Sequence, residues 1–208
     1  MINASALDNG LHAGDLKFVD LDGNNKIEQT TSANDRKDMK VIGNSLPRYN
    51  YNFGISADWY GIDFSVLFQG IGKQNWYPGA ETSMFWGPYS RPYASFIPSD
   101  FMSQVWSEEN TDAYFPRPRG YVALGSNREL AVVNTKYLQN LAYCRLKNLS
   151  IGYTLPDKWL SKIGFEKIRV YFSGENLLTF TKLHSDYIDP EQASASNSWK
   201  TSKSDANI

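Results

Sequence analysis

The sequence predicts an all-β fold in which about four long antiparallel strands form two hairpins. The first observation is that residues 48–69 and 148–173 alternate apolar and polar side chains, the period of two that is typical of a strand with one apolar face. The second is the length of the alternating runs near residue 48, each roughly ten residues, where strands of soluble proteins more often have about five or six. The third is the lack of any run of 18 or more apolar residues, which argues against a membrane-spanning helix.

The first predicted hairpin covers residues 48–69. A turn is expected at Tyr60-Gly61, between two strands of about ten residues, the length with which a tilted strand crosses a bilayer. Tyr49, Trp59 and Tyr60 stand at the strand ends, where membrane strands often have aromatic residues. The residues predicted to share one apolar face are Tyr49, Tyr51, Phe53, Ile55, Ala57, Trp59, Ile62, Phe64, Val66 and Phe68.

The second predicted hairpin lies between residues 143 and 181. Its first strand ends at Pro156, which has no N–H to donate to a strand ladder. One or two turns of helix are then expected before Gly164, because apolar residues recur there at helical spacing. The apolar face is expected to include Leu149, Ile151, Tyr153, Leu155, Ile168, Val170 and Phe172.

The segment GDLKFVDLDGNNKI, residues 14–27, has the start of a calcium-binding loop. Oxygen-bearing side chains at Asp20, Asp22 and Asn24 follow the 1, 3, 5 spacing with which such loops surround the ion, and the backbone carbonyl of Lys26 stands at position seven. We expect Asp35 to supply the remaining acidic ligand across the insertion EQTTSAN. The sequence therefore predicts a calcium site.

The loop departs from an EF-hand at two positions. Asn25 stands where the EF-hand has glycine, and Thr31 stands at the twelfth position, where a bidentate Glu completes the shell. The same residues are also explained without a metal, since Asp and Asn side chains accept hydrogen bonds from backbone N–H groups two or three residues on and so stabilise a turn. Both interpretations stay open.

Residues 71–140 form a long segment rich in proline and tyrosine with no sustained period, and we expect function there. Trp76, Trp86 and Trp106 are the candidate substrate or partner residues, because indole rings stack on the apolar faces of sugars. The alternative is that the three rings pack the loop against itself.

Several classes of function are disfavoured. A net charge of -1 gives no electrostatic reason to bind nucleic acid. The single cysteine, Cys144, excludes an internal disulfide. The two histidines, His12 and His184, have neither metal-ligand nor catalytic-triad spacing, so the protein is not expected to be an enzyme.

Five stretches of the chain share a pattern with a known family. They lie, in order, at residues 14–24 (GDLKFVDLDGN), 41–49 (VIGNSLPRY), 64–70 (FSVLFQG), 145–156 (RLKNLSIGYTLP) and 162–181 (KIGFEKIRVYFSGENLLTFT). Together they resemble the C-terminal barrel region of the SusC/RagA family of TonB-dependent outer-membrane transporters. Residues 106–118 also resemble the family's W-x-x-E-N-x-x-A-x-x-P-R loop. The resemblance covers most of residues 14–190 and is weakest at about 75–135.

The resemblance implies a fold, a location and a function. The fold would be a segment of an antiparallel transmembrane β-barrel with long extracellular loops, in the outer membrane of a Gram-negative, Bacteroidetes-type bacterium. The function would be import of oligosaccharides or other large nutrients, glycan or peptide, with a SusD-like surface lipoprotein as partner and the TonB complex as energy source.

The resemblance also divides the chain. Residues 1–47 would be a loop with the calcium-like turn, residues 48–181 the C-terminal part of the barrel, including the long loop 71–140, and residues 182–208 a further loop. The last strand of the barrel is missing from this pattern, so the chain is expected to be a piece of a larger protein.

The alternative is a soluble, calcium-stabilised β-sandwich that binds carbohydrate. The apolar faces distinguish the two. In a sandwich they would converge on one core, whereas in a barrel they would form an outward band; the residues concerned are Phe53, Ile55, Phe64, Val66, Ile151, Val170 and Phe172.

Overall fold

The computed structural model describes residues 12–30, 32, 34–91, 97–125, 128–161 and 164–196. The chain divides into two compact units. The first, here called the sheet unit, comprises residues 44–75 and 140–183. The second, the loop unit, is drawn from residues 1–43, 76–139 and 184–208. No helix among the described residues is both long and apolar enough to cross a membrane.

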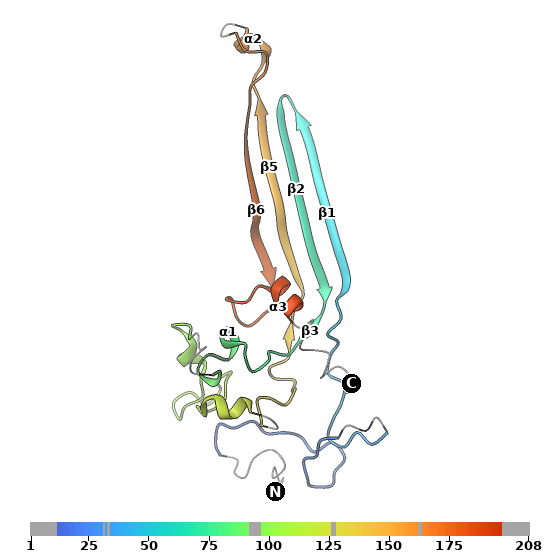
Figure 1. Ribbon diagram of the computed structural model, residues 1–208, viewed down its shortest axis with the longest axis vertical. Coiled ribbons are helices and arrows are strands. Elements are labelled where there is room, and N and C mark those ends of the chain that lie inside the picture. Colours follow the sequence, from blue (N-terminus) through green and yellow to red (C-terminus); the bar gives the residue numbers. More distant parts are fainter. Residues whose placement is uncertain are drawn as a thin grey trace. The chain divides into compact units, whose positions relative to one another are not determined.

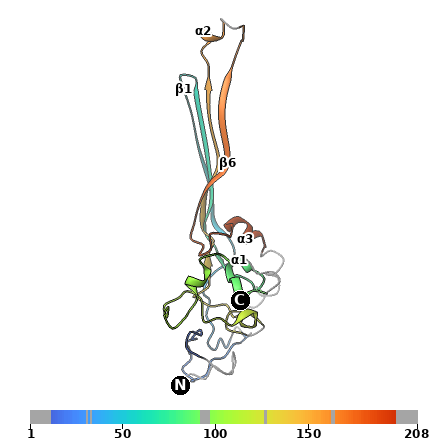
Figure 2. The same cartoon turned by 90° about the vertical axis from the view of Figure 1, so that its left-hand side faces the viewer.

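The sheet unit is built on four long antiparallel strands in the order β1-β2-β5-β6. They are β1 (Arg48–Trp59), β2 (Ile62–Lys73), β5 (Tyr143–Thr154) and β6 (Arg169–Thr181). The four ribbons run side by side in Figure 1, and the turned view in Figure 2 shows them as a single layer. A short helix, α2 (Asp157–Leu160), follows Pro156 between β5 and β6. Both predicted hairpins are confirmed.

The β1–β2 connection is a two-residue turn at Tyr60-Gly61, as predicted. Both residues have positive φ, 47° for Tyr60 and 83° for Gly61, which is the conformation of a type I′ turn whose twist suits a tight hairpin. Gly61 adopts it without steric cost, and Tyr60 is held there by the register in which Trp59 pairs with Ile62.

The register places apolar residues beside apolar residues across all four strands. Val66 pairs with Ile55 on β1 and Leu149 on β5. Ile151 pairs with Phe64 on one side and Phe172 on the other. We call this the apolar face; its members from the predicted set are Phe53, Ile55, Phe64, Val66, Ile151, Val170 and Phe172.

The opposite side of the sheet, the polar face, has matching rows. One row crosses every strand with a serine, because Ser65 pairs with Ser56 and Ser150, and Ser150 pairs with Ser173. The Ser56 and Ser65 hydroxyls lie 3.5 Å apart. The alternation read from the sequence therefore describes two chemically distinct faces.

A β-bulge lies in the second hairpin beyond residue 173, where the alternation read from the sequence stops. The register between β5 and β6 shifts between Leu146 and Asn148, which pair with Leu178 and Glu175. Asn176, inside the bulge, has a φ of 53°. Leu178 pairs with Leu146, which pairs with Phe68 of β2, so Leu178 belongs to the apolar face and the strand continues past the bulge to Thr181.

An ion pair crosses the polar face from β2 to β6. Arg169 donates from Nε to Asp63 Oδ1 at 2.8 Å, and its Nη2 also contacts Asp63 Oδ2. The strand between them is β5, and the residue that pairs with Asp63 on it is Gly152. A Cβ at Gly152 would lie 2.5 Å from Asp63 Oδ1 and 2.6 Å from Arg169 Nη2. The pair therefore needs glycine beneath it.

We expect Gly152→Ala to open this ion pair and to lower the stability of the folded receptor. The side chains of Arg169 and Asp63 are about one-third exposed, so the pair alone contributes little, and the clash adds to this cost. A double-mutant cycle with Asp63→Ala tests this. The measurement is the temperature at which the folded band disappears on electrophoresis, and we expect Gly152→Ala to lower it less in the Asp63→Ala background than in the wild type. Equal costs in the two backgrounds would contradict the account.

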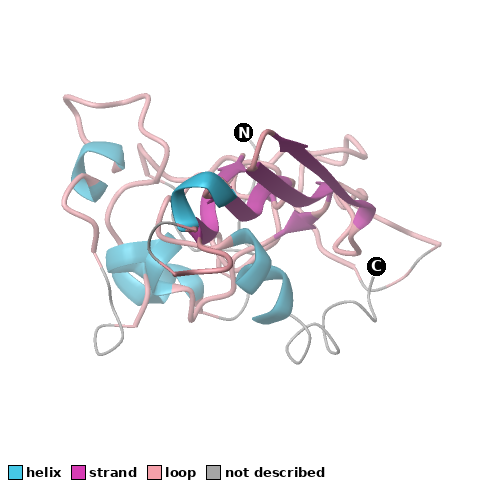
Figure 3. Cartoon of the chain, turned by 90° about the horizontal axis from the view of Figure 1, so that it is seen from above, coloured by secondary structure: helices cyan, strands magenta, loops and turns pink. Residues whose placement is uncertain are grey.

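The loop unit consists mostly of turns and short helices around an aromatic core, and Figure 3 shows how much of it is loop. Its elements are α1 (Ser83–Trp86), α3 (Pro190–Ser196) and the 3-10 helices η1 (Gly87–Tyr89), η3 (Phe101–Gln104) and η4 (Gly120–Leu124). The two-residue strands β3 (Asn75–Trp76) and β4 (Gln139–Asn140) pair with each other. The buried core residues are Phe85, Trp86, Tyr89, Phe101, Val105, Phe115, Ala123, Leu124, Leu130 and Tyr137.

Candidate functional site

The predicted calcium loop folds as a chain of side-chain-to-backbone hydrogen bonds. Asp20 accepts from the backbone N–H groups of Gly23 and Asn25, both at 2.7 Å. Asp22 accepts from the N–H of Asn24 at 3.0 Å, and Asn24 accepts from the N–H of Lys26 at 2.8 Å. These are the Asx turns of the metal-free interpretation, and they also direct carboxylate oxygens toward one place.

The acidic residue that joins Asp20 and Asp22 is Asp38, and not the predicted Asp35. One carboxylate oxygen from each of Asp20, Asp22 and Asp38 lies within 4.8 Å of the others. Asp38 is held there by the N–H groups of Leu21 at 2.6 Å and Glu28 at 2.7 Å.

Asp35 lies outside this group and forms an ion pair with Lys37 instead. Its carboxylate is 3.3 Å from Lys37 Nζ, and this contact is the main reason that the pKa of Lys37 is raised. The insertion therefore brings a different acidic residue back to the loop, three positions later than the sequence suggests.

Backbone hydrogen bonds in the loop favour the ionised form of the Asp20 carboxylate. Desolvation acts to raise its pKa, but the N–H groups of Asn25 and Gly23 more than offset this, and the pKa of Asp20 lies below its ordinary value. Ca²⁺ prefers oxygen ligands such as carboxylates, so these three carboxylates fit the predicted ion.

Calcium binding stays a prediction, with a direct test. We expect isothermal titration of the folded receptor with calcium to release or absorb heat, and Asp22→Ala to weaken binding by about tenfold or more. Asp112→Ala, an exposed carboxylate elsewhere in the loop unit, is the matched control. If wild type and Asp22→Ala give the same null titration, the Asx turns alone explain the residues.

The three candidate tryptophans occupy different environments. Trp86 is fully buried, and its Nε1 donates to the carbonyl of Pro78 at 3.0 Å. Trp76 is 4% exposed. Only Trp106 is partly exposed. Trp86 and Trp76 therefore pack the loop against itself, which is the alternative considered from the sequence, because a ring enclosed by protein cannot stack on a ligand.

Trp106 packs on a segment almost a hundred residues earlier. Gly14 has a φ of 87°, and a Cβ there would overlap the Trp106 ring. The Gly14 carbonyl accepts from the N–H of Arg117 at 2.9 Å, and Arg117 Nε donates to Asp15 at 2.6 Å. The GDLK stretch and the W-x-x-E-N-x-x-A-x-x-P-R stretch thus contact each other, which gives both a structural role.

The aromatic core fixes the conformation of the long loop. Tyr77 donates to the carbonyl of Leu130 at 2.8 Å, and Tyr137 donates to the carbonyl of Tyr114 at 3.1 Å. Burial raises the pKa of both phenols, Tyr77 and Tyr137, so they remain neutral donors at physiological pH.

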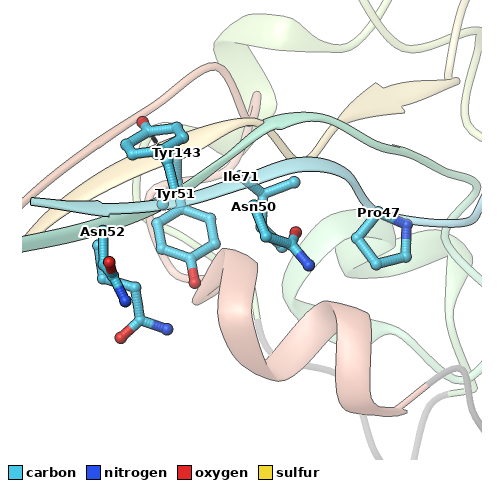
Figure 4. A pocket seen from close by; sticks show the side chains of 8 residues that line it. Pro47, Asn50, Tyr51, Asn52, Ile71 and Tyr143 are labelled. Carbon is cyan, nitrogen blue, oxygen red and sulfur yellow. Dashed lines mark hydrogen bonds between the residues drawn. The ribbon is translucent and has the colours of Figure 1, made fainter.

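The sheet unit contains a pocket that the sequence analysis did not single out. It has a volume of about 380 Å³ and is here called the amide pocket (Figure 4). The only signal in the sequence is the repeated Asn in YNYNF. Its lining residues are Pro47, Asn50, Tyr51, Asn52, Gln69, Gly70, Ile71 and Tyr143.

Comparison with known proteins identifies relatives of the chain. TonB-dependent receptor P3 of Formosa agariphila is 34% identical over 176 residues, covering 84% of this chain and 15% of the relative. TonB-dependent receptor P26 of the same organism is 27% identical over 192 residues, covering 91% of this chain and 17% of the relative. No protein-family model matches the chain.

Solved structures give the same picture for the fold. A chain of the RagAB peptide importer in the open-open state aligns with a TM-score of 0.50 and 24% identity, over 77% of this chain and 16% of that one. A chain of the RagAB peptide transporter aligns with a TM-score of 0.50 and 23% identity, over 74% and 16%.

These relatives are receptors and transporters, and not enzymes. The resemblance to TonB-dependent receptors predicted from the sequence is confirmed, because the curated relatives of the chain carry that name. It spans about 15% of the length of the curated relatives that it matches.

Proposed function

We propose that the sheet unit is part of the wall of an outer-membrane β-barrel and that the whole receptor imports oligosaccharides or other large nutrients. The observation that supports this most is the uncovered apolar face. Ile55 is 59% exposed and Phe172 is 60% exposed, although both stand in the middle of their strands. In water a band of this kind would be costly, whereas lipid tails would cover it.

Strand length supports the same proposal. β1, β2 and β5 have 12 residues and β6 has 13. Twelve residues extend roughly 40 Å, which at a tilt of about 45° is roughly 28 Å across the membrane, close to the thickness of a hydrocarbon core. β1 and β6 are the outer strands of this sheet, so closure into a barrel requires further strands.

The soluble β-sandwich is the weaker candidate. A sandwich needs a second sheet whose apolar residues interdigitate with the first. The other sheet among the described residues consists of two strands of two residues each, which is too small to cover the apolar face. The uncovered Ile55 and Phe172 therefore favour the membrane over a second sheet.

The partners and location follow as parts of the proposal. The outer membrane of a Bacteroidetes-type bacterium, a SusD-like lipoprotein and the TonB complex would provide the lipid, the lid and the energy. The support is that the curated relatives are named TonB-dependent receptors and that the RagAB structures are those of a peptide importer.

Uptake measurements test the proposal. The full-length receptor, expressed with a SusD-like lipoprotein as partner, should be recovered in the outer membrane and should take up labelled oligosaccharide or peptide only when TonB is present. Recovery of the receptor in the soluble fraction, or uptake that does not change when TonB is deleted, would refute it.

A further inference from the structure

The connection between β5 and β6 is longer than strand pairing requires. β5 ends at Thr154 and β6 begins at Arg169, and these two residues pair with each other. At the same end of the sheet, β1 and β2 are joined by two residues, and the carbonyl of the second, Gly61, accepts from the N–H of Thr154 at 2.7 Å. A two-residue turn is thus sufficient there, so residues 155–168, here called the β5–β6 connection, have another role to explain.

The β5–β6 connection is folded and is not a loose turn. The N–H of Leu155 donates to the carbonyl of Ile168 at 2.9 Å and so continues the pairing of the two strands. The N–H of Phe165 donates to the carbonyl of Leu160 at 3.3 Å. The Leu160 side chain, at the end of α2, is 1% exposed. The described part of the connection therefore already buries an apolar side chain.

Two large rings of the same connection stay exposed. Trp159 is 61% exposed and Phe165 is 59% exposed. Leaving apolar rings in water is unfavourable. An indole has an apolar body and a polar N–H, a combination that is favoured at the boundary between lipid headgroups and acyl chains. The exposed rings therefore suit a surface that is apolar on one side and wet on the other.

The β5–β6 connection begins where the apolar face ends. Ile62 pairs with Trp59 on one side and with Tyr153 on the other, and the three residues belong to the last row of that face. All three side chains are exposed. Figure 1 shows α2 beyond the ends of β5 and β6. A bilayer that covers the apolar face would therefore have its surface at the level of the β5–β6 connection.

Two lysines flank the exposed rings. Lys158 precedes Trp159, Lys167 follows Phe165 by two residues, and both lysines are exposed. A lysine can lay its apolar stem along an apolar surface and keep its ammonium in water or beside a phosphate. The residue before each lysine is acidic and balances its charge. The rings, and not a net charge, would therefore decide what the connection binds.

We propose that the β5–β6 connection rests on the bilayer surface and anchors this end of the sheet to phospholipid. Trp159 and Phe165 enter the boundary between headgroups and acyl chains, as the apolar side of an interfacial segment does to a depth of about 5–10 Å. The lysines face the lipid phosphates; free phosphate could satisfy them but not the rings. Both rings lie outside the strand ladder, so they extend the lipid contact beyond the sheet itself. This inference rests on the proposed function, which places the apolar face in lipid.

Single nitroxide labels on the full-length receptor test the inference. The receptor, in a cysteine-free background, is reconstituted in vesicles of phosphatidylethanolamine and phosphatidylglycerol, and collisions with oxygen and with a water-soluble nickel complex are measured. The test positions are 159 and 165. The matched controls are 157 and 166, which are exposed acidic residues of the same connection. Position 151 on β5 reports whether the apolar face is in lipid.

We expect the ratio of oxygen to nickel collisions to be higher at 159 and 165 than at 157 and 166, and to approach the ratio at 151. Heat-modifiable migration on electrophoresis confirms that each labelled receptor is folded. Ratios at 159 and 165 as low as those of the controls would place the connection in water, and low collision rates with both reagents would mean that protein covers it; either result overturns the inference. A lipid-facing 151 combined with such a result contradicts this inference alone, whereas a water-exposed 151 contradicts the proposed function.

Discussion

Ile151→Arg should prevent the receptor from accumulating in the outer membrane, whereas Ser150→Arg should be tolerated. The two residues are neighbours on β5 but belong to opposite faces, since Ile151 pairs with Phe64 and Ser150 pairs with Ser65. An arginine on the lipid-facing side near the middle of a bilayer costs about 2–4 kcal/mol. On the polar face the same side chain would remain in water or meet other polar groups.

The comparison is matched in strand, depth and introduced charge, so only the face differs. The measurement is the amount of heat-modifiable receptor in the outer membrane. Equal loss in both variants would mean that β5 does not have one lipid-facing side, and loss with Ser150→Arg alone would assign the faces the other way round.

Trp86→Ala should unfold the loop unit without disturbing the sheet unit. The Trp86 ring contacts Phe85, Phe115 and Tyr137, with centroids 4.8, 6.3 and 5.2 Å away. Removing a fully buried aromatic ring from such a core lowers the free energy of unfolding by about 3–5 kcal/mol. The sheet strands have their own ladder of hydrogen bonds and are expected to persist.

Hydrogen exchange of the full-length receptor measures this effect. Protection should fall in residues 76–91 and 97–125 and remain in β2 and β5. Trp159→Ala is the control, because that ring is 61% exposed and should cost little. Protection that is unchanged in Trp86→Ala would show that the aromatic core does not stabilise the long loop.

The sheet was predictable from the sequence because its signals are local. A period of two over ten residues specifies which side chains share a face, and a Tyr-Gly pair between two such runs specifies the turn. The end of β6 was not predictable in the same way. The Leu177-Leu178 doublet breaks the period, and only the pairing with β5 shows that a bulge absorbs it.

One missed element did have a sequence signal. Residues 182–208 were predicted to be a loop, but α3 begins at Pro190. Asp189 accepts from the N–H of Glu191 at 2.8 Å, as an N-cap residue does, and proline is favoured in the first turn of a helix. The Asp-Pro-Glu triplet therefore indicated a helix start that polarity alone concealed.

The candidate sites depended on long-range contacts, which the sequence does not reveal. Asp38 rather than Asp35 joins Asp20 and Asp22, because the intervening insertion turns back through hydrogen bonds to Leu21 and Glu28. Similarly, the burial of Trp86 depends on distant residues, because its ring packs against Tyr137, 51 positions later in the chain. The spacing of residue types predicted the chemistry of the metal loop but not its full membership.

Alternating exposure along β5 is the most direct test of the central claim, that this sheet has one face in lipid and the other in a polar interior. Nitroxide labels placed one at a time at residues 148–153 of the full-length receptor, in a background without Cys144, report collision rates with oxygen and with a water-soluble nickel complex. We predict that oxygen collisions peak at 149, 151 and 153 and nickel collisions at 148, 150 and 152. In-phase profiles, or odd positions shielded from both reagents as in the core of a sandwich, would contradict it.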